Sequence, residues 1–87
     1  MMSNEARFTK GDWRVERFVN GKGFEIAFND DGEVIADYVY EESDAHLIAA
    51  APEMYNYISH MINHDMINDH SVEKELISLL AKARGEK

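Results

Sequence analysis

The sequence predicts an α+β fold: a three-stranded antiparallel β-meander covered by two main α-helices, with one short helix over residues 43–50 bridging them. In the first half of the chain, apolar residues alternate with a period of two, and two turn-forming clusters interrupt this alternation. Beyond residue 43, the apolar spacing changes to the three- and four-residue intervals of amphipathic helices. Because a small antiparallel sheet needs a cover on one face, we expect the helices to provide it.

The chain is expected to form a single domain over residues 1–87, with residues 1–9 as a flexible arm. It contains no cysteine, so disulfides cannot support a thin core, and dimerisation is the natural substitute. The longest mostly apolar stretch, residues 47–51, is far shorter than a membrane span. These features favour a cytoplasmic protein that can form a homodimer.

The three strands are predicted from alternation and turn chemistry. Trp13 and Val15 alternate with polar neighbours and predict a strand over residues 13–18. The sequence NGKG at residues 20–23 then predicts a hairpin turn, because Asn and Gly accept positive φ. A second strand follows over residues 24–28, and a second turn (NDDG) leads to the third strand over residues 34–40, where both faces carry apolar residues.

Three helices are predicted after the sheet. Ser43 is the expected N-cap of the short helix, which should end near Ala50 because Pro52 is not tolerated inside a helix. A longer helix should start at Pro52, and its apolar stripe should lie on the sheet. That stripe comprises Met54, Tyr57, Ile58, Met61 and Ile62. The last helix should begin at a Ser71 cap and end at Gly85.

The net charge is −8, and no Lys or Arg occurs over residues 24–73. An acidic surface disfavours direct contact with nucleic acid, whose binding depends on Lys and Arg, and favours a basic protein partner. The run of carboxylates is either a solvated surface or a patch that mimics the spacing of DNA phosphates. The candidate partner-binding residues are Asp30, Asp31, Glu33, Asp37, Glu41, Glu42 and Asp44. Tyr38, Tyr40 and Tyr55 are the tyrosines expected to reach an interface.

No pattern in the chain specifies an enzyme. The serines and the single threonine lack a nucleophile-elbow context, and the turn at residues 20–23 lacks the frame of a phosphate-binding loop. His60 and His64 stand four residues apart and His70 follows, which suggests a metal- or small-ligand-binding module as an alternative. Neither a third ligand at defined spacing nor a general-base Glu between the histidines is present, so we assign no metal and no cofactor.

The order of these segments resembles a group of small phage and prophage accessory proteins. The resemblance rests on Gly11-Asp12-Trp13 at the first strand, Val34-Ile35-Ala36-Asp37 in the third, and the helix entry AHLIAAAPEM at residues 45–54. It covers roughly residues 9–60. Asp12 replaces the proline usual in the group, and residues 55–57 (YNY) replace a plainer Leu-rich helix. The group carries no established activity.

The resemblance implies a phage context, in which small acidic accessory proteins often bind host machinery. Together with the charge, it predicts a phage-encoded, non-catalytic protein-binding protein acting in the host cell. The expected partner is a basic host nucleic-acid-binding protein or defence complex, which the acidic surface would inhibit in the manner of an anti-CRISPR protein. The alternatives are a ligand-binding module at His60, His64 and His70, and a structural homodimer of unknown role.

Overall fold

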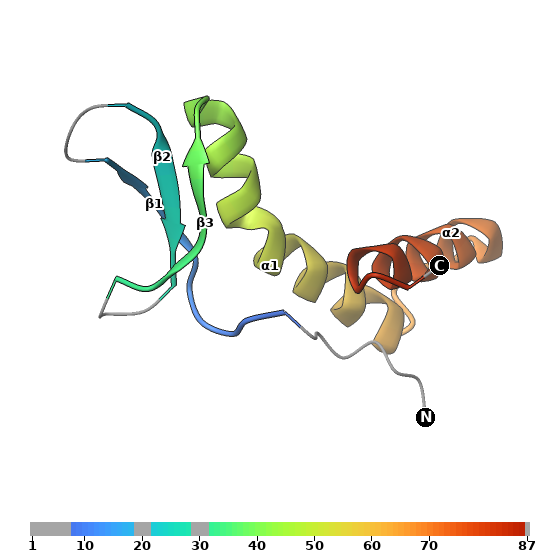
Figure 1. Cartoon of the computed structure of the whole chain (residues 1–87). Coiled ribbons are helices and arrows are strands. Elements are labelled where there is room, and N and C mark those ends of the chain that lie inside the picture. The colour runs from blue at the N-terminus through green and yellow to red at the C-terminus, as the bar shows by residue number, and fades with distance from the viewer. Residues whose placement is uncertain (1–7, 19–21, 29–31, 87) are drawn as a thin grey trace. The chain divides into compact units, whose positions relative to one another are not determined.

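The computed structural model describes residues 8–18, 22–28 and 32–86 and confirms the α+β fold (Figure 1). Its elements are β1 (Arg14–Arg17), β2 (Phe24–Ala27), β3 (Val34–Val39), α1 (Glu42–Asn63) and α2 (His70–Ala83). The described residues fall into two compact units. We call residues 9–52 the sheet unit, and Phe8 together with residues 53–86 the helical unit.

The predicted antiparallel meander is confirmed, with strand order β1-β2-β3. Phe18 N–H donates to the Gly23 carbonyl (3.2 Å) and closes the first hairpin, and Phe28 N–H donates to the Glu33 carbonyl (3.0 Å) and closes the second. Gly23 has φ 88°, a conformation that glycine adopts without steric cost. The other predicted turn residues, 20, 21 and 29–31, lie outside the described residues.

The core of the sheet unit is a cluster of three buried residues, Phe24, Ile26 and Ala45. Ala45 belongs to the first turns of α1, which lie beside β3 in Figure 1. Ala45 is fully buried, so its small side chain allows the helix backbone to approach the sheet closely. Partly buried apolar residues surround these three: Trp13, Val15, Ile35, Ala36, Val39, Ile48 and Ala49.

The sequence left open which face of β3 packs on the core, because both faces carry apolar residues. Two irregularities in the strand explain the observed packing. The pairs Phe24↔Val39, Ile26↔Ala36 and Ala27↔Val34 require an extra residue on β3 between each successive pair. Such β-bulges shift the alternation of side chains. As a result Ile35 and Ala36, although adjacent, both pack against the core.

The predicted short helix ending near Ala50 is wrong, because α1 runs unbroken from Glu42–Asn63 with Pro52 in its interior. The proline removes one hydrogen bond, the one to the Ile48 carbonyl, and its ring crowds that carbonyl. Apolar anchors hold the helix on both sides of it: Ala45 and Ile48 in the sheet-unit core, Tyr55 and Ile62 in the helical-unit core. Packing therefore outweighs the local preference to stop.

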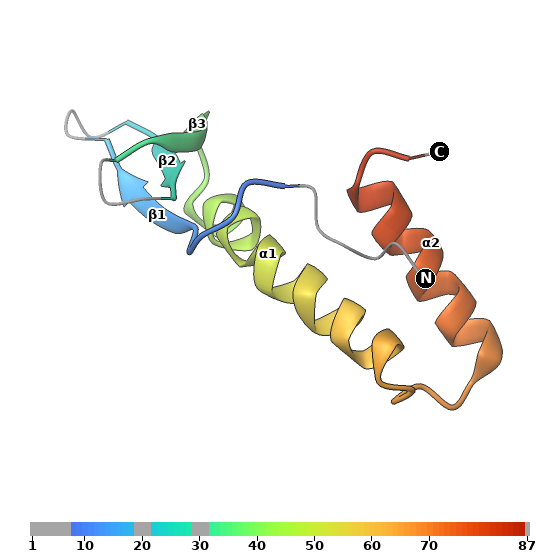
Figure 2. The same ribbon diagram turned by 90° about the horizontal axis from the view of Figure 1, so that it is seen from below.

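The expected inward stripe of the second helix is also corrected. Ile58 and Ile62 pack with Leu76, Ile77 and Leu80 of α2 in the core of the helical unit, and the two helices form a hairpin (Figure 2). Met54 and Tyr57 are exposed. Buried positions along the continuous helix are 45, 52, 55 and 62, spaced by seven and three residues. The predicted stripe included the exposed Met54 and Tyr57 and omitted the buried Tyr55.

A buried arginine organises the helical unit. The Arg84 side chain is only 6% exposed and pairs with the Glu86 carboxylate at 2.9 Å. Its Nη1 donates to the Tyr55 hydroxyl (2.9 Å), and the Tyr55 ring in turn meets Phe8 edge-on, at 5.2 Å between centroids. The hydrogen bonds to Glu86 and then to Tyr55 raise the pKa of Arg84 above its usual value, which keeps the charge fixed. Phe8, which belongs to the arm predicted over residues 1–9, thus packs on α1.

The ends of α2 follow cap chemistry. The N-cap is Asp69 and not the predicted Ser71, because Asp69 Oδ1 accepts hydrogen bonds from the backbone of Ser71 (2.9 Å) and Val72 (3.1 Å). The predicted stop at Gly85 is confirmed. Gly85 has φ 86° and its N–H donates to the Lys82 carbonyl, while Glu86 N–H donates to Ala81, which is a Schellman motif.

We predict that Pro52→Ala increases the helix content and raises the free energy of unfolding by about 1–3 kcal/mol, because it restores one hydrogen bond in an already continuous helix. Circular dichroism at 222 nm and urea titration measure both quantities. Ala51→Gly, in the adjacent exposed position, is the control and should destabilise the protein. A destabilised Pro52→Ala would contradict this prediction and show that packing of the ring dominates.

The Asp69 cap predicts a dependence of stability on pH. Its hydrogen bonds, first that to Val72 and then those to Ser71, lower the pKa of Asp69 below its usual value of 3.8. The carboxylate therefore stabilises the folded state above about pH 4, and this contribution disappears as the pH falls through the lowered folded-state pKa. We expect Asp69→Ala to destabilise the protein near pH 6 and to approach the unmodified protein in stability near pH 2, measured by urea unfolding. A difference that stays constant with pH would contradict a charged cap.

Candidate functional site

The acidic residues predicted to bind a partner are distributed along β3 and the start of α1. Among the described ones, Glu33 precedes β3 and Asp37 lies within it. Glu41 directly precedes α1, and Glu42 and Asp44 belong to its first turn. All five are exposed. Asp30 and Asp31 lie outside the described residues.

Distance divides these carboxylates into two sets. The strand β3 separates Glu33 from the start of α1, and six residues at about 3.3 Å each span roughly 20 Å. This exceeds the Debye length of about 8 Å at physiological ionic strength, so Glu33 adds little to the field at the helix start. Asp37 lies four residues from both Glu33 and Glu41, and we group it with Glu41, Glu42 and Asp44 as the acidic segment, residues 37–44.

Among the described residues, one arginine of the sheet contacts this segment. Arg17 of β1 has Nη2 at 4.0 Å from Glu42 Oε1, and its guanidinium carbon lies 4.8 Å from the centre of the Phe24 ring. His46 adds a second contact to Glu42, at 3.4 Å between Nε2 and Oε2. Within the described part of the chain, no ion pair involves Asp37, Glu41 or Asp44. The segment therefore keeps most of its negative charge.

The helix start itself explains part of this arrangement. Ala45 N–H donates to the Glu41 carbonyl (3.1 Å), so Glu41 occupies the N-cap position, and the predicted cap Ser43 lies inside the first turn. Glu42 and Asp44 are close to the positive end of the helix macrodipole, which stabilises each by about 0.3–1 kcal/mol. Asp37, in β3, gains nothing from the helix.

Two exposed tyrosines lie between Asp37 and Glu41. Tyr38 is 66% exposed and Tyr40 is 76% exposed, and a role of these residues at an interface stays a prediction. Tyr55, also predicted to reach one, is buried and bonded to Arg84. Tyr38 has φ 59°, which is unfavourable for a bulky side chain, and it lies at a bulge of β3. Its ring meets Phe18 edge-on, at 5.3 Å between centroids.

The structure brings together two of the three histidines of the predicted ligand-binding module. The rings of His60, in the last turn of α1, and His64, just after it, lie 4.3 Å apart between centroids, and Tyr57 stacks on His60. His70 begins α2, where its nearly fully exposed ring approaches Glu73 at 3.9 Å. Over residues 8–18, 22–28 and 32–86, no group of three His, Asp or Glu side chains is placed to hold a metal ion.

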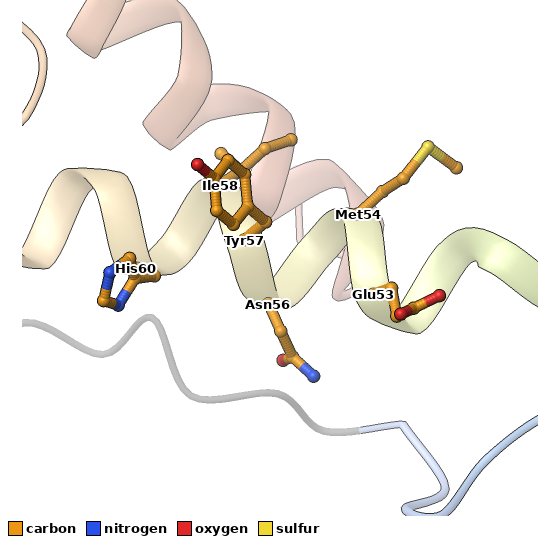
Figure 3. Close-up of a pocket in the computed structure, with 6 residues that line it drawn as sticks. All are labelled: Glu53, Met54, Asn56, Tyr57, Ile58 and His60. Carbon is orange, nitrogen blue, oxygen red and sulfur yellow. The ribbon is translucent and has the colours of Figure 1, made fainter.

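A hollow of about 630 Å³ lies along α1 in the helical unit. The described residues that line it are Glu53, Met54, Asn56, Tyr57, Ile58 and His60. All six come from about two turns of one helix, and Figure 3 shows Asn56 and His60 on one side of it and Met54 on the other. Sites for small ligands enclose most of the ligand among converging groups. This open hollow has no such convergence, and we assign it no ligand.

Comparison with known protein families places this surface in context. The family model described as Salmonella phage P22 protein Y8K6 matches residues 1–87. The chain belongs to this Y8K6 family. Searches of curated proteins and of solved structures gave no match. Membership confirms that the chain is a small phage protein, and its function has to be argued from the surface.

No helix in the described part of this Y8K6 family protein is both long and apolar enough to cross a membrane.

Sequence reasoning missed two features of the acidic segment. The contact between Arg17 and Glu42 joins residues from different elements, and no local period indicates it. The hairpin turn at residues 20–23 does place Arg17 opposite Phe24, so strand register was the available signal for the ring contact. The positive φ of Tyr38 left no trace in the sequence, because positive φ is normally indicated by Gly, Asn or Asp.

The backbone of Tyr38 predicts a difference between two substitutions in this Y8K6 family protein. Both Tyr38→Gly and Tyr38→Ala remove the ring and its contact with Phe18, but only glycine adopts φ 59° without steric cost. We expect Tyr38→Gly to be more stable than Tyr38→Ala by about 1 kcal/mol, measured by urea unfolding. Equal stabilities would mean that β3 relaxes to a regular conformation in the alanine variant.

Proposed function

We propose that this Y8K6 family protein is a phage-encoded, non-catalytic binding protein whose acidic segment occupies a basic site on a host protein. The observation that carries the proposal is the acidic segment itself, in which Asp37, Glu41 and Asp44 are exposed and have no ion-pair partner among the described residues. With a net charge of −8, the chain repels nucleic acid and attracts proteins that bind it. The partner class we propose is therefore a basic nucleic-acid-binding protein or defence complex of the host cell, inhibited in the manner of an anti-CRISPR protein.

The proposed site is smaller than the seven acidic residues of the sequence prediction, of which Asp30 and Asp31 lie outside the described residues. Four of them, Asp37, Glu41, Glu42 and Asp44, form the acidic segment, while Glu33 lies at the other end of β3. Four exposed carboxylates within eight residues can occupy contacts that a partner uses for phosphates. Exposed charges of this kind mainly raise the association rate and make binding depend on salt.

The competing explanation is that the carboxylates only stabilise α1 and keep the protein in solution. It accounts for Glu42 and Asp44, which lie in the first helical turn. It does not account for Asp37 or for the two large tyrosines exposed between the charges. A binding role accounts for both.

The test is a variant that neutralises Glu41→Gln, Glu42→Gln and Asp44→Asn together. We expect it to lose at least tenfold in affinity for a basic host partner captured at low salt, because three exposed charges act on the same site. Capture from host lysate, repeated at about 0.5 M salt where exposed charges are screened, identifies that partner. Titration calorimetry with the purified partner then gives the affinity.

A matched control separates position from net charge. Glu53→Gln, Asp65→Asn and Glu75→Gln neutralise three exposed carboxylates of the helical unit and change the net charge by the same amount. Equal loss of affinity in the two triple variants would reject the acidic segment as the site. Circular dichroism of both variants verifies that α1 remains helical, since the first variant removes charges that favour its start.

A further inference from the structure

The acidic segment carries a second feature besides its charge. Of residues 37–44, only Val39 is turned toward the core, and the other seven are exposed. Tyr38 follows Asp37, and Tyr40 precedes Glu41, so each aromatic ring is adjacent in sequence to a carboxylate. Large aromatic side chains this exposed are typical of binding surfaces, where they supply contact area at low entropic cost.

The backbone at Tyr38 restricts how a partner can bind here. β3 forms an edge of the sheet, and an edge strand normally offers its backbone to an added strand. The positive φ of Tyr38 and the bulge next to it interrupt that backbone in the middle of β3. Recognition at the acidic segment must therefore use side chains.

Resting on the proposed function, we infer that Tyr38 and Tyr40 make the acidic segment selective for arginine over lysine, so that its partner is an arginine-rich protein segment. A guanidinium group stacks on an aromatic face and pairs with a carboxylate at the same time, whereas an ammonium group is compact and strongly hydrated. Two exposed rings flanked by carboxylates fit the guanidinium group. To an ammonium group, the same residues offer only charge.

The sheet unit already contains one example of this binding mode. The guanidinium of Arg17 lies 4.8 Å from the centre of the Phe24 ring and 4.0 Å from Glu42 Oε1. The chain thus places its own arginine between a ring and a carboxylate at the border of the acidic segment. Tyr38 next to Asp37, and Tyr40 next to Glu41, offer the same two kinds of chemical group in neighbouring positions of the sequence.

Other partners fit this surface less well. A nucleic acid would bring phosphates against four carboxylates. An apolar partner would bury those carboxylates without an opposite charge. The free energy lost in this way exceeds what contacts with the two rings would gain. A lysine-rich segment would neutralise the charge but leave both rings without a specific contact.

The test compares nona-arginine with nona-lysine, labelled with the same fluorophore, in anisotropy titrations of the full chain at about 50 mM salt. We expect nona-arginine to bind at least about fivefold more tightly, the effect of two exposed cation–π contacts. In the variant Tyr38→Gly/Tyr40→Ala this preference should fall below twofold, while the affinity for nona-lysine should change by less than twofold. Glycine suits the positive φ of residue 38, so the variant keeps its fold.

Tyr57→Ala is the matched control, because Tyr57 is 60% exposed but belongs to the helical unit. It should keep the full preference for arginine. Three results would overturn the inference and leave the proposed function standing. The unmodified protein could bind both peptides with equal affinity, the preference for arginine could survive the loss of both rings, or it could fall equally in Tyr57→Ala. If neither peptide binds, the proposed function fails as well.

Discussion

The packing of Ala45 against Phe24 and Ile26 is the contact on which the rest of the sheet unit depends. A three-stranded antiparallel sheet cannot bury enough apolar surface alone, so it needs the first turns of α1 as a cover. Because Ala45 and Ile26 are both fully buried, the helix start can move little relative to the strands. This fixes Glu41, Glu42 and Asp44 directly after β3 and brings Glu42 within reach of Arg17.

The same helix continues into a second core of different chemistry. In the helical unit, Tyr55, Ile62 and Leu80 are buried, and Arg84 is held between the Tyr55 hydroxyl and the Glu86 carboxylate. A guanidinium this enclosed is stable only because it is paired and hydrogen-bonded. Arg84 therefore has a structural role within the helical unit.

The acidic segment combines requirements of folding and of binding. Carboxylates in the first turn of α1 favour the helix, whereas Asp37 and the exposed rings of Tyr38 and Tyr40 contribute little to either core. The positive φ of Tyr38 has a cost of about 1 kcal/mol or more that a glycine would avoid. Strain of this kind persists where the surrounding structure holds it, and it is frequent at functional sites.

The sequence by itself determined the features that depend on near neighbours: the three strands, the Gly85 helix stop and the charge of the acidic segment. Period-two alternation, glycine at positive φ and charge are all local properties. Tertiary structure alone decided that α1 continues through Pro52, that its inward face includes Tyr55, and that Arg17 reaches Glu42. These outcomes depend on contacts between distant residues, where packing on both sides of a weak point outweighs the local preference, and no local pattern encodes that balance.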